Sequence, residues 1–155
     1  MEFQFHLERE LRSLHRDLMY GMYRHGTYRT FIVRDPKERM ISVASVRDRL
    51  VHRLLYDYLV SIYDREFMFD VWSSRKDKGL TKALARLQSF VKQYEGEFFW
   101  RADIHRFFDH IDHTILLQLL ERRIHDVRAF SLLREVIDSF PYPKVERERE
   151  SCRIF

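Results

Sequence analysis

Acidic residues and histidines crowd into one short stretch, WRADIHRFFDHIDH, at residues 100–113. Asp103 follows the apolar run Phe98-Phe99-Trp100, so the sequence predicts a buried strand that ends in a carboxylate. The end of a strand is a rigid position that opens to a cleft, and carboxylate oxygens are suitable ligands for Mg²⁺. Asp103 is therefore a candidate metal ligand, with an ordinary turn-capping aspartate as the alternative.

The other ionisable residues of this stretch have simpler explanations. Asp112 precedes a helical apolar pattern and is suited to cap that helix. His105, His110 and His113 match no familiar zinc-binding spacing. We therefore expect solvated histidines near a phosphate-binding surface rather than zinc ligands.

Cations gather in a second place that could do chemistry. Arg34, Lys37 and Arg39 surround Asp35-Pro36, a turn signal between two β-prone runs. A hairpin tip with several cations can hold a triphosphate or a phosphate backbone. The same charges also occur on solvated turns that protect strand edges from pairing. The residues alone give these two explanations equal weight.

Apolar periodicity predicts the elements that must position these residues. Helical periods are found at residues 7–21, 46–62, 80–94, 113–120 and 127–137, and β-prone runs at residues 30–34, 40–43 and 98–103. Asp112 and Asp126 are predicted to cap the last two helices, and residues 64–79 are expected to be irregular. The expected fold class is α+β with few strands.

The composition limits the possible classes of protein. The 155 residues suffice for one core, and 45% hydrophobic with 34% charged residues is typical of a folded chain. An aromatic content of 15% predicts a core rich in rings. The net charge of +4 favours a polyanionic partner such as nucleic acid. We expect a cytoplasmic protein with no membrane partner, because neither a signal peptide nor a membrane span is visible and Cys152 is the single cysteine.

Four sequence blocks occur in an order that resembles the bacterial reverse transcriptases of retrons, group II introns and diversity-generating elements. The blocks are a basic hairpin (FIVRDPKERMISV), VRDRLVH, SRKDKG with a following AL, and ADIHRFFDHIDH. The resemblance covers roughly residues 7–140. It implies a mostly helical fingers region with a β-hairpin over residues 1–96. The first segment of a right-hand polymerase palm, with the catalytic strand, would follow over residues 97–140, and residues 141–155 would form a charged, irregular tail.

The resemblance implies roles for three residues of the palm segment. Asp103 corresponds to the first catalytic aspartate, which binds the two Mg²⁺ ions of the polymerase site. The backbone carbonyl of Ile104 would add a ligand. Phe108 corresponds to the aromatic residue that lies under the sugar of the incoming nucleotide and blocks a 2′-hydroxyl. The implied reaction is nucleotidyl transfer by a two-metal mechanism.

In the fingers, the resemblance implies contacts with the nucleotide and with nucleic acid. Lys37 and Arg39, helped by Arg34, correspond to the cations that hold the triphosphate. Arg75 and Gly79 correspond to a segment near the template and the nucleotide. The implied partners are an RNA template, a DNA or RNA primer and deoxynucleoside triphosphates.

The sequence also departs from the family. It contains no Tyr-x-Asp-Asp motif, which supplies two further catalytic carboxylates, and no Gly-x-Pro-x-Gly block follows VIDSF. We therefore expect a truncated chain that is inactive alone, or that acts with a second polypeptide that completes the palm. The alternative is a non-catalytic nucleic-acid-binding fragment or subunit. The weakest hypothesis is a metal-dependent nuclease that uses Asp103, Asp109 and the nearby histidines.

Overall fold

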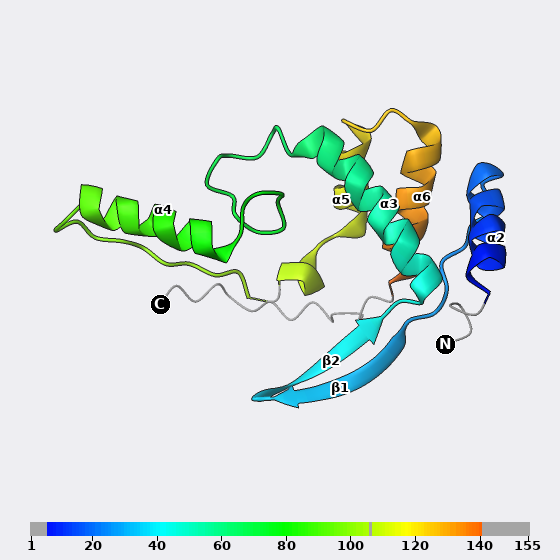
Figure 1. The fold of residues 1–155 in the computed structure, drawn as a ribbon, viewed down its shortest axis with the longest axis horizontal. Coiled ribbons are helices and arrows are strands. Elements are labelled where there is room, and N and C mark those ends of the chain that lie inside the picture. The colour runs from blue at the N-terminus through cyan, green and yellow to red at the C-terminus, as the bar shows by residue number, and fades with distance from the viewer. Residues whose placement is uncertain (1–5, 106, 141–155) are drawn as a thin grey trace. The chain divides into compact units, whose positions relative to one another are not determined.

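The structure is a computed structural model, and it describes residues 6–105 and 107–140 (Figure 1). In these residues it contains five α-helices, one 3-10 helix and one two-stranded antiparallel sheet, so the α+β class is confirmed. The chain divides into two compact units: unit 1 comprises residues 1–55 and 106–155, and unit 2 comprises residues 56–105. The predicted tail, residues 141–155, lies outside the described residues.

Unit 1 holds α2 (Leu7–Met19), β1 (Arg29–Asp35), β2 (Lys37–Val43), the 3-10 helix η1 (Phe107–His110), α5 (His113–Glu121) and α6 (Val127–Ser139). Helix α3 (Val46–Tyr63) begins in unit 1 and ends in unit 2, which also holds α4 (Leu80–Gln93). These bounds confirm the predicted helices and the irregular stretch that precedes α4. No helix in the described part of the chain has both the length and the apolar character needed to cross a membrane.

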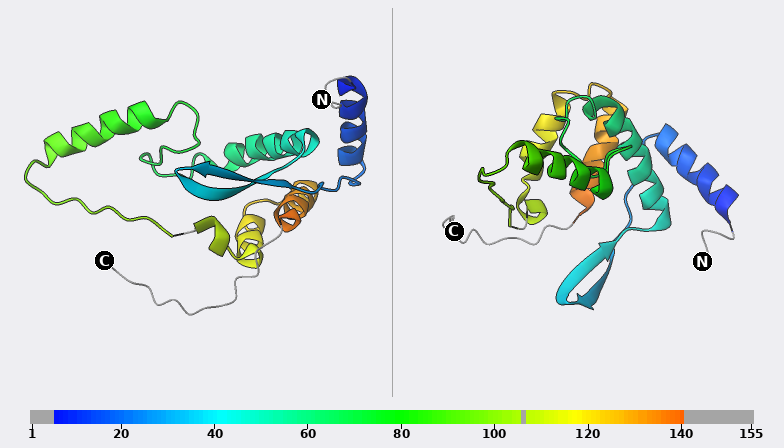
Figure 2. Two further views of the ribbon diagram at one scale, coloured as in Figure 1. Left: turned by 90° about the horizontal axis from the view of Figure 1, so that it is seen from below. Right: turned by 60° about the vertical axis from the view of Figure 1, so that its left-hand side comes forward.

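Strands β1 and β2 form the predicted hairpin. Arg34 pairs with Glu38 and Asp35 with Lys37, so the chain reverses at Pro36. Every residue of β1 is exposed. The right-hand view of Figure 2 shows the hairpin extending away from α6 and from the first part of α3, both of which belong to its own unit. The hairpin is therefore a projecting ribbon, and only its base is joined to the body of unit 1.

The described core is small and belongs to unit 1. Its buried hydrophobic residues are Leu14, Tyr23, Ala44, Val51, Leu55, Ile124 and Leu133. Tyr23 is the one aromatic residue in that set, so the prediction of a ring-rich core is wrong. No residue of unit 2 is buried. Rings such as Phe98 and Trp100 lie on a segment that no other part of unit 2 covers, so their abundance does not translate into burial.

Aspartates begin the last two helices, as predicted. The Asp112 carboxylate accepts hydrogen bonds from the backbone N–H groups of Thr114 and Ile115, at 2.8 and 3.1 Å. These bonds satisfy two of the free donors of the first turn of α5, and they lower the pKa of Asp112. Asp126 caps α6 in the same geometry. Helices α5 and α6 pack against each other.

The predicted buried strand at residues 98–103 is wrong. The structure forms no strand there, and Phe98, Phe99 and Trp100 are 102%, 91% and 87% exposed. A strand must pair its backbone N–H and C=O groups with a neighbouring strand. Within the described residues β1 and β2 are the only strands, and they pair with each other. The apolar run therefore has neither a backbone partner nor a covering face.

Candidate functional site

The predicted site residues divide between the two units. Arg34, Lys37 and Arg39, together with Phe108, belong to unit 1, whereas Asp103, Ile104 and Arg75 belong to unit 2. Each group is therefore described within its own unit.

The hairpin tip (residues 34–39) carries its two arginines on opposite faces. Arg34 pairs with Glu38 and Arg39 with Val33, so the two arginines occupy neighbouring register positions, and side chains of neighbouring pairs alternate between faces. Arg34 Nε donates to Glu38 Oε2 at 3.2 Å in an exposed ion pair. Such pairs contribute little stability, so the ion pair can open for another anion. Within the described residues Arg39 is exposed and has no ion-pair partner. The two cations do not form one cradle as they stand, and Arg39 is the more available.

The residues predicted to bind the metal and the sugar are exposed. Asp103 and Ile104 lie in the segment that forms no strand, and Ile104 is 69% exposed. Within residues 6–105 and 107–140 no group of three potential metal ligands gathers. A Mg²⁺ site needs several oxygen ligands in octahedral geometry, so the described residues do not form one by themselves. Phe108 lies in η1, is 82% exposed and packs edge-on against Phe107 with ring centroids 5.3 Å apart.

Arg75 fixes the irregular segment that precedes α4. Its guanidinium donates to the Asp64 carboxylate at 2.7 Å and to the backbone carbonyls of Asp64, Met68 and Val71. The hydrogen bond from Arg75 lowers the pKa of Asp64. The side chain of Arg75 is 13% exposed and its donors are engaged within the loop. This structural role was not predicted, and the predicted contact of Arg75 with the nucleotide stays a prediction.

A buried carboxylate at the base of the hairpin was missed at the level of sequence. Asp48, in the first turn of α3, is 1% exposed. It accepts hydrogen bonds from Tyr23 Oη at 2.8 Å, from Ser45 Oγ at 2.6 Å and from the backbone N–H of Gly26. We call Tyr23, Gly26, Ser45 and Asp48 the root network. The signal that could have revealed it is Ser45-x-x-Asp48, a capping-box pattern, in which Ser45 Oγ also accepts from the Asp48 backbone N–H at 3.1 Å.

Electrostatics support a charged Asp48. Burial alone would raise the pKa of this carboxyl, but the hydrogen bonds from Ser45 and Tyr23, the nearby His25 and the Gly26 N–H outweigh burial and lower it. Burial and the hydrogen bond to Asp48 raise the pKa of the Tyr23 phenol far above its usual value. A cluster of donors thus satisfies an ionised carboxylate inside unit 1, which is the condition for burying a charge.

The chain segment that leads into β1 runs between α3 and α6, as the left-hand view of Figure 2 shows. His25 stacks on His52 of α3, and their Nε2 atoms are 3.0 Å apart. The backbone N–H of His25 donates to Glu135 of α6 at 3.0 Å. Tyr28 bonds Ser139 at the end of α6 and stacks on His25. Contacts with two helices therefore fix this leg of the hairpin.

The tautomers of the histidine pair follow from its partners. His25 Nδ1 is 2.6 Å from the carbonyl oxygen of Gly26, which only accepts, so Nδ1 carries a proton. Of the two facing Nε2 atoms one must donate and the other accept, so at least one of the two rings is neutral. Burial and the neighbouring His25 lower the pKa of His52, and Asp48 partly opposes them. A second positive charge on this pair is therefore disfavoured.

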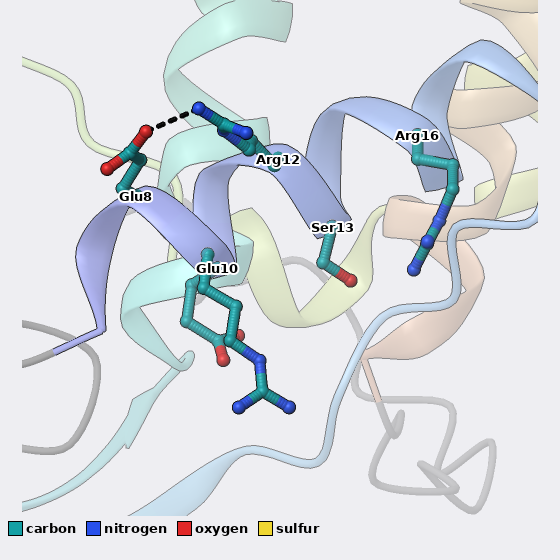
Figure 3. A pocket seen from close by; sticks show the side chains of 6 residues that line it. Glu8, Glu10, Arg12, Ser13 and Arg16 are labelled. Atoms are coloured by element: carbon teal, nitrogen blue, oxygen red, sulfur yellow. Dashed lines mark hydrogen bonds and ion pairs between the residues drawn. The ribbon is translucent and has the colours of Figure 1, made fainter.

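One hollow is lined by α2 alone and carries no site. Glu8, Glu10, Arg12, Ser13 and Arg16 border it together with Arg9 (Figure 3). Glu8 and Arg12 form an exposed ion pair one helical turn apart, which Figure 3 marks. A single helix surface with mixed charges is typical of a solvated face.

Comparisons with known proteins give two distant similarities. The chain is 25% identical over 139 residues to "Protein YkfC" of Escherichia coli, a match that covers 86% of this chain and 36% of that protein. It is 30% identical over 103 residues to an "Uncharacterized 91 kDa protein in cob intron" of Schizosaccharomyces pombe, which covers 66% of this chain and 12% of that protein. No family model matches. The chain is thus similar, over part of its length, to a large protein of an intron, and it spans about a third or less of either relative.

Proposed function

We propose that this chain is the fingers region and first palm segment of an RNA-directed DNA polymerase, and that its hairpin tip holds phosphate groups. Three observations support the proposal: the order of the sequence blocks, the similarity to a protein of an intron, and the exposed, cation-bearing hairpin. The hairpin is the observation on which the proposal mainly rests. Its tip is free in solvent while its base is fixed, which suits a grip on a charged ligand.

The proposal separates binding from catalysis. Asp103 is the one carboxylate of this chain assigned to metal, besides the backbone carbonyl of Ile104, and the Tyr-x-Asp-Asp carboxylates are absent from the sequence. Binding of the phosphate backbone requires only cations at the right spacing. The chain by itself would therefore bind nucleic acid without polymerising.

Binding of an RNA–DNA hybrid as a function of salt concentration tests the proposal. Replacement of Arg34, Lys37 and Arg39 by alanine should weaken binding and flatten the slope of log affinity against log salt by about one unit per lost phosphate contact. The matched control replaces Arg9, Arg122 and Arg128, three cations outside the hairpin, and removes the same charge. Equal slopes for the two triple variants would show that the hairpin is only a charged turn.

A non-catalytic nucleic-acid-binding subunit is the second candidate function. It requires only the exposed arginines of the hairpin and no carboxylates beyond those of this chain. Both candidates predict the same binding, so template-directed incorporation distinguishes them once a Tyr-x-Asp-Asp segment is supplied. The nuclease hypothesis gains no support from the described residues, since no three potential metal ligands gather among them.

A further inference from the structure

Asp48 lies where the two legs of the hairpin leave the body of unit 1. Gly26 precedes β1 by three positions and Ser45 follows β2 by two, and both donate to the same carboxylate of α3. Tyr23 adds a third donor from the β1 side. One buried side chain therefore joins both legs of the ribbon to the start of one helix.

The fit at this point is close. A Cβ atom on Gly26 would lie 2.9 Å from Asp48 Oδ2, nearer than ordinary contact. The carboxylate cannot swing aside without losing its bonds to Ser45 and Tyr23. Arg47 borders the network, and its guanidinium bonds Asp17 of α2 at 2.8 Å and lies over the ring of Tyr23. The root network is thus held from several sides.

We propose that Asp48 is a positioning residue: by joining Gly26, Ser45 and Tyr23 to α3, its carboxylate sets the direction in which the hairpin tip points. A two-stranded ribbon that is exposed along its whole first strand has few other contacts to fix its orientation. The functional consequence rests on the proposed function, since it requires that the tip hold phosphates. The effect of Asp48 on the direction of the hairpin tip does not depend on the proposed function.

Electron paramagnetic resonance distances between spin labels test the positional consequence. In a Cys152→Ser background, the labels are placed at Met40→Cys on β2 and Val127→Cys on α6, two exposed positions of unit 1. Asp48→Asn keeps the size of the side chain but exchanges one acceptor oxygen for an NH2 donor, so the three donors of the root network face a single acceptor oxygen. The distance distribution should broaden by roughly twofold, as expected when a local tether is released.

A matched control separates position from general loss of stability. Asp112→Ala removes a helix cap in unit 1, away from the hairpin, and should leave the width of the distribution unchanged. If Asp48→Asn does not fold, Ser45→Ala and Tyr23→Phe each remove one bond and should each broaden the distribution in part. An unchanged width in the folded Asp48 variant, or in both single-bond variants, would overturn the proposal.

Hybrid binding adds the functional test. Asp48→Asn keeps every cation of the tip, so affinity should fall by roughly three- to tenfold, the range typical of coupling between a remote residue and a binding site, while the salt slope stays the same. A flatter slope of log affinity against log salt, with unchanged affinity, would contradict a purely positional role of Asp48. If the unaltered chain binds no hybrid, the proposed function fails, and the distance measurement still decides the role of Asp48.

Discussion

The base of the hairpin and the segment at residues 98–103 differ in how their residues are satisfied. At the base, Asp48 is the one buried charged residue among the described residues. Its carboxylate accepts hydrogen bonds from Tyr23, which precedes β1, and from Ser45, which follows β2. In the segment, three large rings are almost fully exposed and no strand forms. No role was predicted for Asp48, whereas a rigid strand end was predicted at Asp103. A residue type shows what chemistry is possible, and the partners present decide whether that chemistry is assembled.

The largest expected effect on stability comes from Asp48→Ala. The change leaves the Tyr23 hydroxyl and the Gly26 N–H without their acceptor, so we expect a loss on the order of 3 kcal/mol in the free energy of unfolding. Urea denaturation followed by circular dichroism measures it. A double-mutant cycle with Tyr23→Phe should show coupling between the two sites. Strictly additive effects would mean that the 2.8 Å contact carries no stability.

Gly26→Ala should have the second largest effect, about 1–3 kcal/mol of destabilisation, because its Cβ would overpack against the fixed carboxylate of Asp48. Thermal melting of the variant measures the loss. Gly26→Ala made in an Asp48→Ser variant should cost less, because the shorter serine side chain leaves space for the added Cβ atom. An equal cost in both backgrounds would place the strain elsewhere than at the root network.

The histidine pair predicts a pH dependence. Since the pKa of His52 is lowered in the folded chain, the folded state takes up a proton less readily than the unfolded state. The stability from the neutral His52 is complete above the unfolded pKa of about 6.5, and it is lost as the pH falls below that value towards the folded pKa. His52→Gln should flatten the fall between about pH 7 and pH 5. Equilibrium unfolding over this range measures the slope, and His15→Gln removes an exposed histidine as the control. If His52→Gln left the dependence of the free energy of unfolding on pH unchanged, a lowered pKa of His52 in the folded chain would be contradicted.

The smallest effect is expected at Trp100. Because its ring is 87% exposed, Trp100→Ala should change the free energy of unfolding by less than about 0.5 kcal/mol. Trp72→Phe leaves Trp100 as the single tryptophan of the chain. Its fluorescence should then resemble that of tryptophan in water and be quenched readily by acrylamide. A blue-shifted emission that acrylamide quenches poorly would show that the segment is covered. The segment would then not differ from the hairpin base in the burial of its residues.

Local signals predicted most of the fold. Apolar periods gave the helices, Asp35-Pro36 gave the turn of the hairpin, and Asp112 and Asp126 gave two helix starts, since each of these depends on residues close in sequence. The strand at residues 98–103 could not be judged this way, because a strand forms only if another strand is present to pair with it. The burial of Asp48 depends on Tyr23, which lies 25 positions away, so the local sequence predicted the helix that begins near Val46 but not a buried carboxylate.

Membership of a polymerase metal site depends on Asp103, and one assay tests this role directly. The chain is joined to a palm segment that carries Tyr-x-Asp-Asp and assayed for template-dependent incorporation of deoxynucleotides in Mg²⁺, with Asp103→Asn and Asp112→Ala compared. We predict that the joined chain incorporates, that Asp103→Asn abolishes incorporation without lowering the melting temperature, and that Asp112→Ala lowers the melting temperature by a few degrees but keeps incorporation. Near-normal incorporation by Asp103→Asn would contradict the assignment of this chain to the first half of a polymerase metal site.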